Sequence, residues 1–202
     1  MLIYLRLVTM EILLLLSCCI GDYLLLHPIK QSQLLTAATD SLTHGIVGAF
    51  SWAIICDVKF TRQTVLECFL CGLLAMSVDI DHFLSAKSFH LKDALSLPRR
   101  PPFHATTVII LVDLVLITLS FILDQKFLLG AYLFTTAWFS HHVRDGHRRG
   151  LWFYPFGDTS PIPQYYYLFI IFIFPLITRF IYLKFYKPYI TDRVIELDAM
   201  MV

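Results

Sequence analysis

Residues 164–185 have the sequence QYYYLFIIFIFPLITRFIYLKF, which is long and apolar enough to cross a bilayer as a helix. A helix rises about 1.5 Å per residue, so a hydrocarbon core of about 30 Å needs about 20 such residues. The tyrosines at 165–167 suit one headgroup region, and Lys184 and Lys187 suit the other. This stretch therefore predicts a transmembrane helix.

Five further hydrophobic segments precede it along the chain. Short breaks with proline or charged residues separate them, and each is close to the length of one membrane crossing. Their approximate bounds are 3–26, 34–56, 63–85, 103–124 and 127–145. We predict an all-α fold: a polytopic transmembrane bundle of about six helices that forms one domain over 1–187, with an exposed C-terminal tail over 188–202.

The composition indicates an integral, multi-pass membrane protein. Of the 202 residues, 57% are hydrophobic and 15% are charged, and the mean hydropathy of +0.69 is too high for a soluble globular chain. The net charge of +1 and the dispersed basic residues argue against nucleic acid as a partner. All five cysteines lie in hydrophobic segments, so we expect no disulfide framework. Glu11 interrupts the first segment, which favours a retained helix over a signal peptide.

Ionisable side chains interrupt these segments or lie at their ends. On insertion scales a charge inside a bilayer costs roughly 2.5–3.5 kcal/mol, so such residues usually face a protein interior and mark function. All of them are of types that bind metals or move protons. They are Asp40, His44, Asp79, Asp81, His82, His104, His141, His142 and Asp145.

Alternation of the helices across the membrane brings these residues to one side. With six crossings, the second and fourth helices begin on the side where the third and fifth helices end. The ionisable groups therefore meet there, and the segments 86–102 and 146–163 cover that side. Basic residues are divided almost equally between the two sides, so the positive-inside rule does not assign either side to the cytosol.

The spacing within each segment decides which side chains can share a site. Asp40 and His44 are four residues apart on one helix face, where the carboxylate can orient the imidazole. The alternative is a neutral histidine with an interhelical hydrogen bond. Asp79 and His82 also share a face, but Asp81 points about 200° away from Asp79 in a regular helix. Both carboxylates can face one site only if the helix unwinds there; the alternative is a solvated helix end.

His104 follows the basic stretch LPRRPPF at the start of the fourth helix. Arg99 and Arg100 in this stretch can hold an anionic group such as a phosphate. The alternative is a basic patch that meets lipid headgroups. Asp113 lies on the opposite face of the same helix, so we expect it to be a hydrogen-bond partner in packing.

The fifth helix ends with SHHVRDG, in which two histidines can pair with Asp145. His141 lies four residues before Asp145 and has the smaller angular offset, so we predict it as the ligand. His142 then takes a supporting position. The alternative is a surface ion pair between Arg144 and Asp145, which would contribute little. We expect His147 to lie in a loop and assign it no role.

Together these side chains predict one divalent-metal site. Imidazole nitrogens and carboxylate oxygens at one depth suit zinc, manganese or iron, and we favour zinc or manganese. Such an ion lowers the pKa of a bound water toward about 7 and provides a nucleophile. The predicted ligands are His44, Asp79, His141 and Asp145, with Asp40, His82 and His142 as the residues that orient them.

The same motifs resemble those of the bacterial membrane-bound metal-dependent hydrolases. In chain order the pattern is THxxxG from Thr43, DxD from Asp79, a basic stretch that ends at His104, and HxxxD from His141. The resemblance implies metal binding or catalysis at these positions, with Asp81 and His104 as catalytic residues. This chain has Arg99 where the bacterial pattern has a histidine. More closely, the segments DSLTHGIVGAFSWA, VDIDHFL and LPRRPPFHATTVI resemble the transmembrane protein 267 family of animals.

The leading interpretation is a metal-dependent hydrolase of a lipid-like substrate, with membrane lipid as the partner and Arg99 and Arg100 near the headgroup. A second interpretation is a carrier of protons or metal ions, in which the same residues form a relay. A third is a non-catalytic membrane scaffold that retains a buried polar network.

Overall fold

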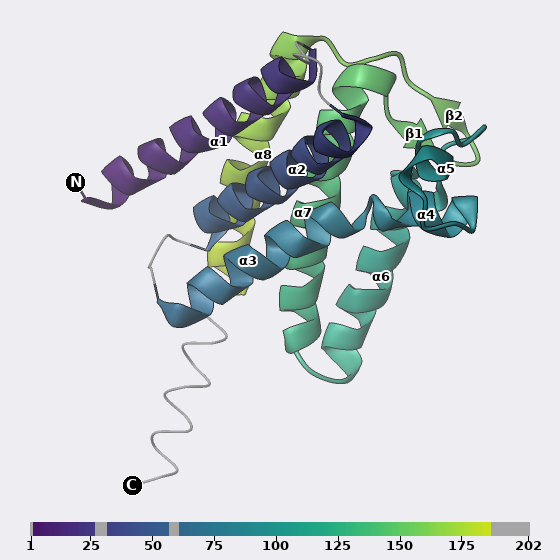
Figure 1. Ribbon diagram of the computed structural model, residues 1–202. Coiled ribbons are helices and arrows are strands. Elements are labelled where there is room, and N and C mark those ends of the chain that lie inside the picture. The colour runs from purple at the N-terminus through teal and green to yellow at the C-terminus, as the bar shows by residue number, and fades with distance from the viewer. Residues whose placement is uncertain (1, 27–31, 57–60, 187–202) are drawn as a thin grey trace, which may run out of the picture.

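Helices dominate the computed structural model, which describes residues 2–26, 32–56 and 61–186 (Figure 1). Its helices are α1 Leu2–Leu26, α2 Gln33–Ile55, α3 Arg62–Ser77, α4 Ile80–Ala86, α5 Leu91–Leu95, α6 Thr107–Ile122, α7 Lys126–Arg149 and α8 Gln164–Phe185. A short 3₁₀ helix, η1, covers Pro102–His104, and strands β1 Trp152–Phe153 and β2 Gly157–Asp158 form an antiparallel hairpin. The all-α prediction is confirmed. The predicted tail over 188–202 lies outside the described residues, so the domain division stays a prediction.

Three stretches of helix are long and apolar enough to cross a membrane within the described ranges. They are Tyr4–Leu26 in α1, Arg62–Ala86 across α3 and α4, and Gln164–Phe185, which is α8. Helix α6 is also apolar but is shorter. The six-helix transmembrane bundle therefore stays a prediction.

Helices α2 and α7 lie at the centre of the arrangement. Helix α2 contacts α1, α3, α7 and α8, and α7 contacts α2, α3, α6 and α8 (Figure 1). The surrounding helices expose many apolar side chains, including Leu66 and Phe69 of α3 and Leu114 of α6, while the inner faces of α2 and α7 are buried. The two central helices can therefore carry polar groups that are shielded by protein.

Small residues allow α2 and α3 to pack closely. A Cβ atom added at Gly48 would lie 2.9 Å from the Cβ of Ala75, and one at Gly72 would lie 2.8 Å from the carbonyl oxygen of Gly45. Close approach through glycine is typical of helices packed in membranes. It brings the end of α3, and Asp79 just beyond it, close to His44 on α2.

The predicted helix over 63–85 is interrupted after Ser77. The amides of Asp79, Asp81 and His82 donate to the carbonyls three residues earlier, at 3.3, 3.3 and 3.2 Å. This is the tighter 3₁₀ pattern, which changes the direction of the side chains relative to a continuous helix. The helical stretch predicted over 63–85 is present, with this turn inside it. The unwinding that both carboxylates needed in order to face the same group of residues occurs here.

Helix α7 extends beyond its predicted end at Asp145. It continues through Gly146 to Arg149, so the prediction that 146–149, including His147, lie in a loop is wrong. The carbonyl of Gly146 accepts from the amides of Gly150 and Ile162, which holds this turn in place. The helix ends at Gly150, where φ is +75° and a Cβ would lie 1.9 Å from the carbonyl oxygen of Thr159.

The predicted helix over 103–124 begins later, at Thr107. The amide of Thr106 donates to the carbonyl of Trp152 at 2.7 Å, and Ala105 forms a parallel bridge with Trp152. These contacts hold residues 105–106 against the hairpin instead of in a helix. As a result, His104 lies on η1, just before α6 begins.

Candidate metal centre

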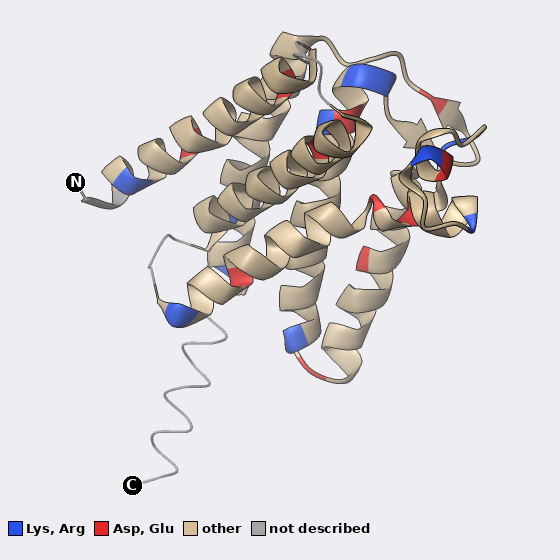
Figure 2. Ribbon diagram, viewed as in Figure 1, with Lys and Arg blue, Asp and Glu red and all other residues tan. Residues whose placement is uncertain are grey.

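The candidate centre lies at one end of the bundle. Helix α2 begins there, α3 gives way to α4, and α7 ends. Figure 2 shows acidic and basic residues close together on α2 and the end of α7, with further acidic residues at the α3–α4 junction. The predicted gathering of ionisable residues from four segments is present in the structure.

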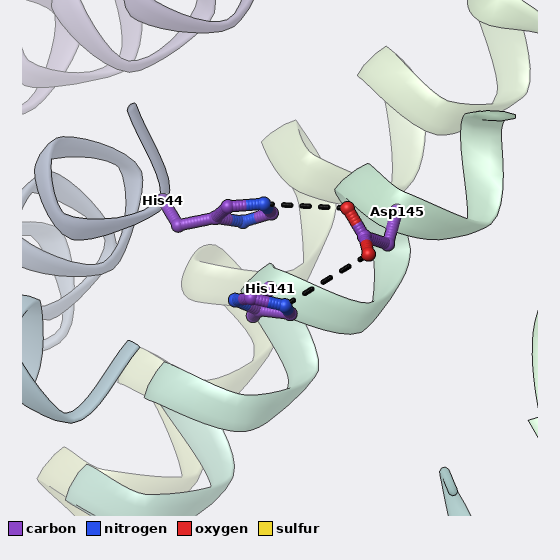
Figure 3. A group of neighbouring side chains, drawn as sticks. All are labelled: His44, His141 and Asp145. Carbon is purple, nitrogen blue, oxygen red and sulfur yellow. Dashed lines mark ion pairs between the residues drawn. The ribbon is translucent and has the colours of Figure 1, made fainter. Parts of the chain in front are cut away.

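Five side chains, called here the His/Asp cluster, direct potential ligand atoms at one another. They are His44, Asp79, His104, His141 and Asp145. The Nε2 atoms lie 3.3 Å (His44) and 3.9 Å (His141) from Asp145 oxygens, as Figure 3 shows. The Nε2 of His104 lies 3.6 Å from Asp79 Oδ1 and 3.7 Å from Asp145 Oδ2, and the Nε2 of His141 lies 3.7 Å from Asp79 Oδ1. The rings of His44 and His141 stack with centroids 3.7 Å apart.

These separations fit metal coordination. Two ligand atoms that are each about 2.1 Å from one ion lie at most about 4.2 Å apart, and the separations above are shorter. The ligand atoms form two overlapping groups, His44–His141–Asp145 and Asp79–His104–His141, which share His141. The Nε2 atoms of His104 and His141 are buried and have no hydrogen-bond partner among the described residues. An unpaired buried polar atom costs about 1–3 kcal/mol, and coordination would remove that cost. The cluster therefore fits a divalent metal with mixed nitrogen and oxygen ligands.

Backbone carbonyls orient two of the histidines. The Nδ1 of His141 lies 2.9 Å from the carbonyl oxygen of Ala75, and the Nε2 of His142 lies 2.9 Å from that of Phe103. A carbonyl only accepts, so each of these nitrogens carries the proton. The Nε2 of His141 is then left with a lone pair that faces the cluster, as a metal ligand requires. His142 bonds away from the cluster, in agreement with the choice of His141.

Asp81 lies behind His104 as seen from the cluster. Its Oδ1 is 3.3 Å from the Nδ1 of His104 and 3.3 Å from the Nδ1 of His82, while its Oδ2 accepts from the amide of Phe103 at 2.6 Å. Asp81 thus contacts the His104 nitrogen that points away from Asp79 and Asp145. This position suits a residue that orients His104, and the predicted catalytic roles of Asp81 and His104 stay predictions.

The neighbouring carboxylates also change the protonation of His104. Burial alone would lower its pKa, but the nearby carboxylates of Asp79, Asp81 and Asp145 outweigh that effect and raise the pKa of His104 to about 9. A metal ion that binds at Nε2 must displace this proton.

Two arginines hold the carboxylates of α1, α2 and α7. The buried Arg144 pairs with Asp22 at 3.2 Å and with Asp40 at 2.5 Å. Arg148 pairs with Asp40 at 2.9 Å and with Asp145. The alternative of a surface ion pair between Arg144 and Asp145 is wrong, because Arg144 points inward to other helices. Asp40 also lies 3.6 Å from the Nε2 of His44, the residue it was expected to orient.

Asp22 and Arg148 were missed at the sequence level, although both left a signal. Asp22 is an isolated carboxylate inside the first hydrophobic segment. Arg148 is three residues after Asp145, which places the two on one helix face once α7 is known to continue.

The two predicted anion-binding arginines differ in their surroundings. Arg100 donates to the carbonyl of Gly150 at 3.1 Å and to that of Arg149, and it pairs with Asp158 at 3.3 Å. Arg99 is exposed and lines a pocket of about 230 Å³ beside Arg100. Arg100 therefore has a structural task, and anion binding by the pair stays a prediction.

Asp113 occupies the packing position that was predicted for it. Its Oδ2 accepts from the hydroxyl of Thr135 on α7 at 2.5 Å, away from the His/Asp cluster. That prediction is confirmed.

Similarity to known proteins gives the chain its family. It is 43% identical over 169 residues to transmembrane protein 267 of Bos taurus, a match that covers 82% of this chain and 78% of that protein. The chain belongs to the transmembrane protein 267 family. It is also 39% identical over 154 residues to the Mus musculus protein and 37% identical over 154 residues to the Danio rerio protein, covering 71% and 69% of them. No protein-family model and no solved structure matches the chain.

The family name agrees with the apolar helices of the fold. Members are named as transmembrane proteins, and three helical stretches of this chain are long and apolar enough to cross a membrane. This member of the transmembrane protein 267 family is therefore a membrane protein.

Proposed function

We propose that this chain is a multi-pass membrane protein that binds a divalent metal, zinc or manganese, in the His/Asp cluster and hydrolyses a lipid-like substrate there. The observation that carries the proposal is the convergence of three imidazole Nε2 atoms and two carboxylates from α2, the α3–α4 junction, η1 and α7. The resemblance to bacterial membrane-bound metal-dependent hydrolases gives the reaction class.

Multiple crossings are supported by the position of the polar helices. Helices α2 and α7 have 23 and 24 residues, which is enough for a crossing, but they carry the ionisable groups of the site. Ionisable residues within membrane proteins usually face the bundle interior. Here His44 and His141 are fully buried between helices, so neither need contact lipid.

The chemistry follows from the atoms around the cluster. When bound, a divalent metal supplies Lewis-acid polarisation and a more acidic water. Asp81 fixes the ring of His104, and Arg148 balances the charge of Asp145. A cavity of about 20 Å³ bordered by His104, His142 and Asp145 has room for about one water molecule. Hydrolysis consumes that water and yields an acid and an alcohol from an ester.

The test is turnover by purified protein in vesicles of phosphatidylcholine and phosphatidic acid. We expect release of fatty acid or phosphate that a chelator stops and that added zinc or manganese restores. Asp145→Asn should abolish this release, whereas Asp113→Asn, which changes a half-buried carboxylate outside the cluster, should retain it. Turnover that is unchanged by the chelator and by Asp145→Asn would refute the proposal. Metal uptake into the vesicles without turnover would support the carrier instead. The absence of both uptake and turnover would support the scaffold.

A further inference from the structure

A basic pocket lies on one side of the His/Asp cluster. It has a volume of about 230 Å³, and its lining includes Arg99, Arg100, Arg149 and His82. Arg99 and Arg149 are exposed, so their guanidinium groups are accessible from outside. Guanidinium groups at this density suit a phosphate or carboxylate, which they bind through charge-assisted hydrogen bonds.

An apolar groove lies on the other side. It has a volume of about 660 Å³ and runs between the start of α6 and the β1–β2 hairpin. Val108, Ile110 and Leu111 form one wall, and Trp152 and Phe156 lie on the other. This volume is within the range of small-ligand sites.

The small cavity at the cluster lies next to both of these spaces. It shares Arg100 and Arg149 with the basic pocket and Trp152 with the apolar groove, and it is bordered by His104 and Asp145 of the cluster. An anion site, the candidate metal centre and an apolar groove therefore follow one another along one end of the bundle.

We propose that this row of sites binds a single-chain anionic amphiphile. The alkyl chain occupies the groove, the anionic group meets Arg99 and Arg149, and the bond between them lies at the His/Asp cluster. This inference names the substrate class for the proposed hydrolase and so rests on that function.

The surroundings of the groove favour a lipid chain as its occupant. Ile110, Leu111 and Leu114 of α6 are 64%, 62% and 63% exposed, so the groove continues directly into an apolar helix face. In a membrane protein such a face contacts acyl chains. A chain can therefore enter from the bilayer sideways, while its charged end remains near the basic pocket at the headgroup level.

The test uses dodecylphosphonate with a diazirine near the end of the chain, because its carbon–phosphorus bond resists hydrolysis. Full-length protein in phosphatidylcholine vesicles is photolabelled, and the labelled residues are mapped by mass spectrometry. We expect saturable labelling at the hairpin and the first turns of α6. Non-specific labelling of the lipid-facing surface should instead rise in proportion to the concentration of the probe.

Two matched pairs of variants test the two ends of the site. Ile110→Trp, which fills the groove, should lower the saturable labelling severalfold, whereas Leu114→Trp, one turn away on the same face, should not. Arg99→Ala should lower it severalfold, whereas Lys92→Ala, an exposed basic residue of the same segment outside the pocket, should not. Dodecanol with the same diazirine should show no saturable labelling.

Metal content is measured in the same preparations, which separates this inference from the proposed function. Labelling that does not saturate and is unchanged by Ile110→Trp and Arg99→Ala would overturn the proposal of an amphiphile site, even if metal is bound. Saturable labelling that both variants reduce would uphold it, even if no metal is found and the hydrolase proposal fails.

Discussion

His104 is the residue on which the acidic groups of the site converge. Its Nε2 faces Asp79 and Asp145, and its Nδ1 faces Asp81. Contacts of η1 hold the ring in place. The amide of Phe103, in the same 3₁₀ helix, donates to Asp81, and the carbonyl of Phe103 accepts from the Nε2 of His142. Carboxylates that hold a ligand histidine in this way raise its basicity and fix its orientation.

Substitution of Asp81 tests this positioning role. Asp81→Asn keeps the shape of the side chain but removes the charge behind His104. We expect an approximately 10–100-fold loss of zinc affinity, as for other residues that orient metal ligands. Calorimetric titration of zinc into purified protein measures it. The control is Asp113→Asn, which should leave the affinity unchanged; equal losses in both variants would contradict the assignment.

Metal affinity should also depend on pH through His104. The carboxylates raise the pKa of this histidine to about 9, so below that pH a metal ion must displace its proton. The apparent affinity should therefore rise with pH, by up to about tenfold per unit, and level off near pH 9. Titrations with a metal buffer, together with measured proton release, check this. An affinity that is constant between about pH 7 and 9 would contradict it.

At the scale of the elements, helix packing positions the side chains of the His/Asp cluster. Gly48 lets α2 approach α3, and the Nδ1 of His141 bonds to the Ala75 carbonyl and so holds α7 against α3. The turn after Ser77 then directs Asp79 and Asp81 to opposite nitrogens of His104. The ligand geometry thus depends on contacts made along the helices, outside the cluster.

Gly48→Leu should separate α2 from α3. The added side chain would overlap Ala75, and overpacking of this kind costs about 1–3 kcal/mol. We expect a lower thermal midpoint and weaker zinc binding, measured in the same detergent. Gly130→Leu on α7 is the control, because a Cβ there meets nothing within 4 Å. Similar losses in both variants would show that the close approach at Gly48 is not needed.

Hydropathy was enough to predict the helices but not their interruptions. The predicted segment 34–56 corresponds to α2, and 164–185 corresponds to α8, because the length of an apolar run is local information. The break after Ser77 and the continuation through Gly146 depend on distant contacts, such as the bond from the Ile162 amide to the Gly146 carbonyl. Helical spacing was enough to place His141 beside Asp145, and its role as a metal ligand stays a prediction. The position of His104 next to Asp79 and Asp145 depends on η1, which the hydropathy pattern did not predict.

At the scale of the whole molecule, one end of the bundle holds the chemistry. The α3–α4 junction, η1, the hairpin and the end of α7 all meet there (Figure 1). The predicted six-crossing arrangement would explain this, because it returns alternate helix ends to the same side of the membrane. It predicts the segments 86–102 and 146–163 on one side and the α6–α7 turn on the other.

Labelling of single cysteines tests this topology. In a chain without its five native cysteines, Ser96→Cys and Thr159→Cys should react alike with a membrane-impermeant maleimide applied to sealed vesicles. Lys126→Cys at the start of α7 should show the opposite accessibility. If all three positions react from the same side, the six-crossing bundle is wrong.

The central claim is that the His/Asp cluster binds a metal ion, and metal analysis of the purified protein tests it most directly. We predict about one zinc or manganese ion per chain, since the two groups of potential ligands, His44–His141–Asp145 and Asp79–His104–His141, share the single Nε2 of His141. The double variant His44→Ala with Asp79→Ala should lose this ion, whereas Asp113→Asn should retain it. Protein that holds no metal after purification with added zinc and manganese, or equal metal content in the double variant, would contradict metal binding at the His/Asp cluster.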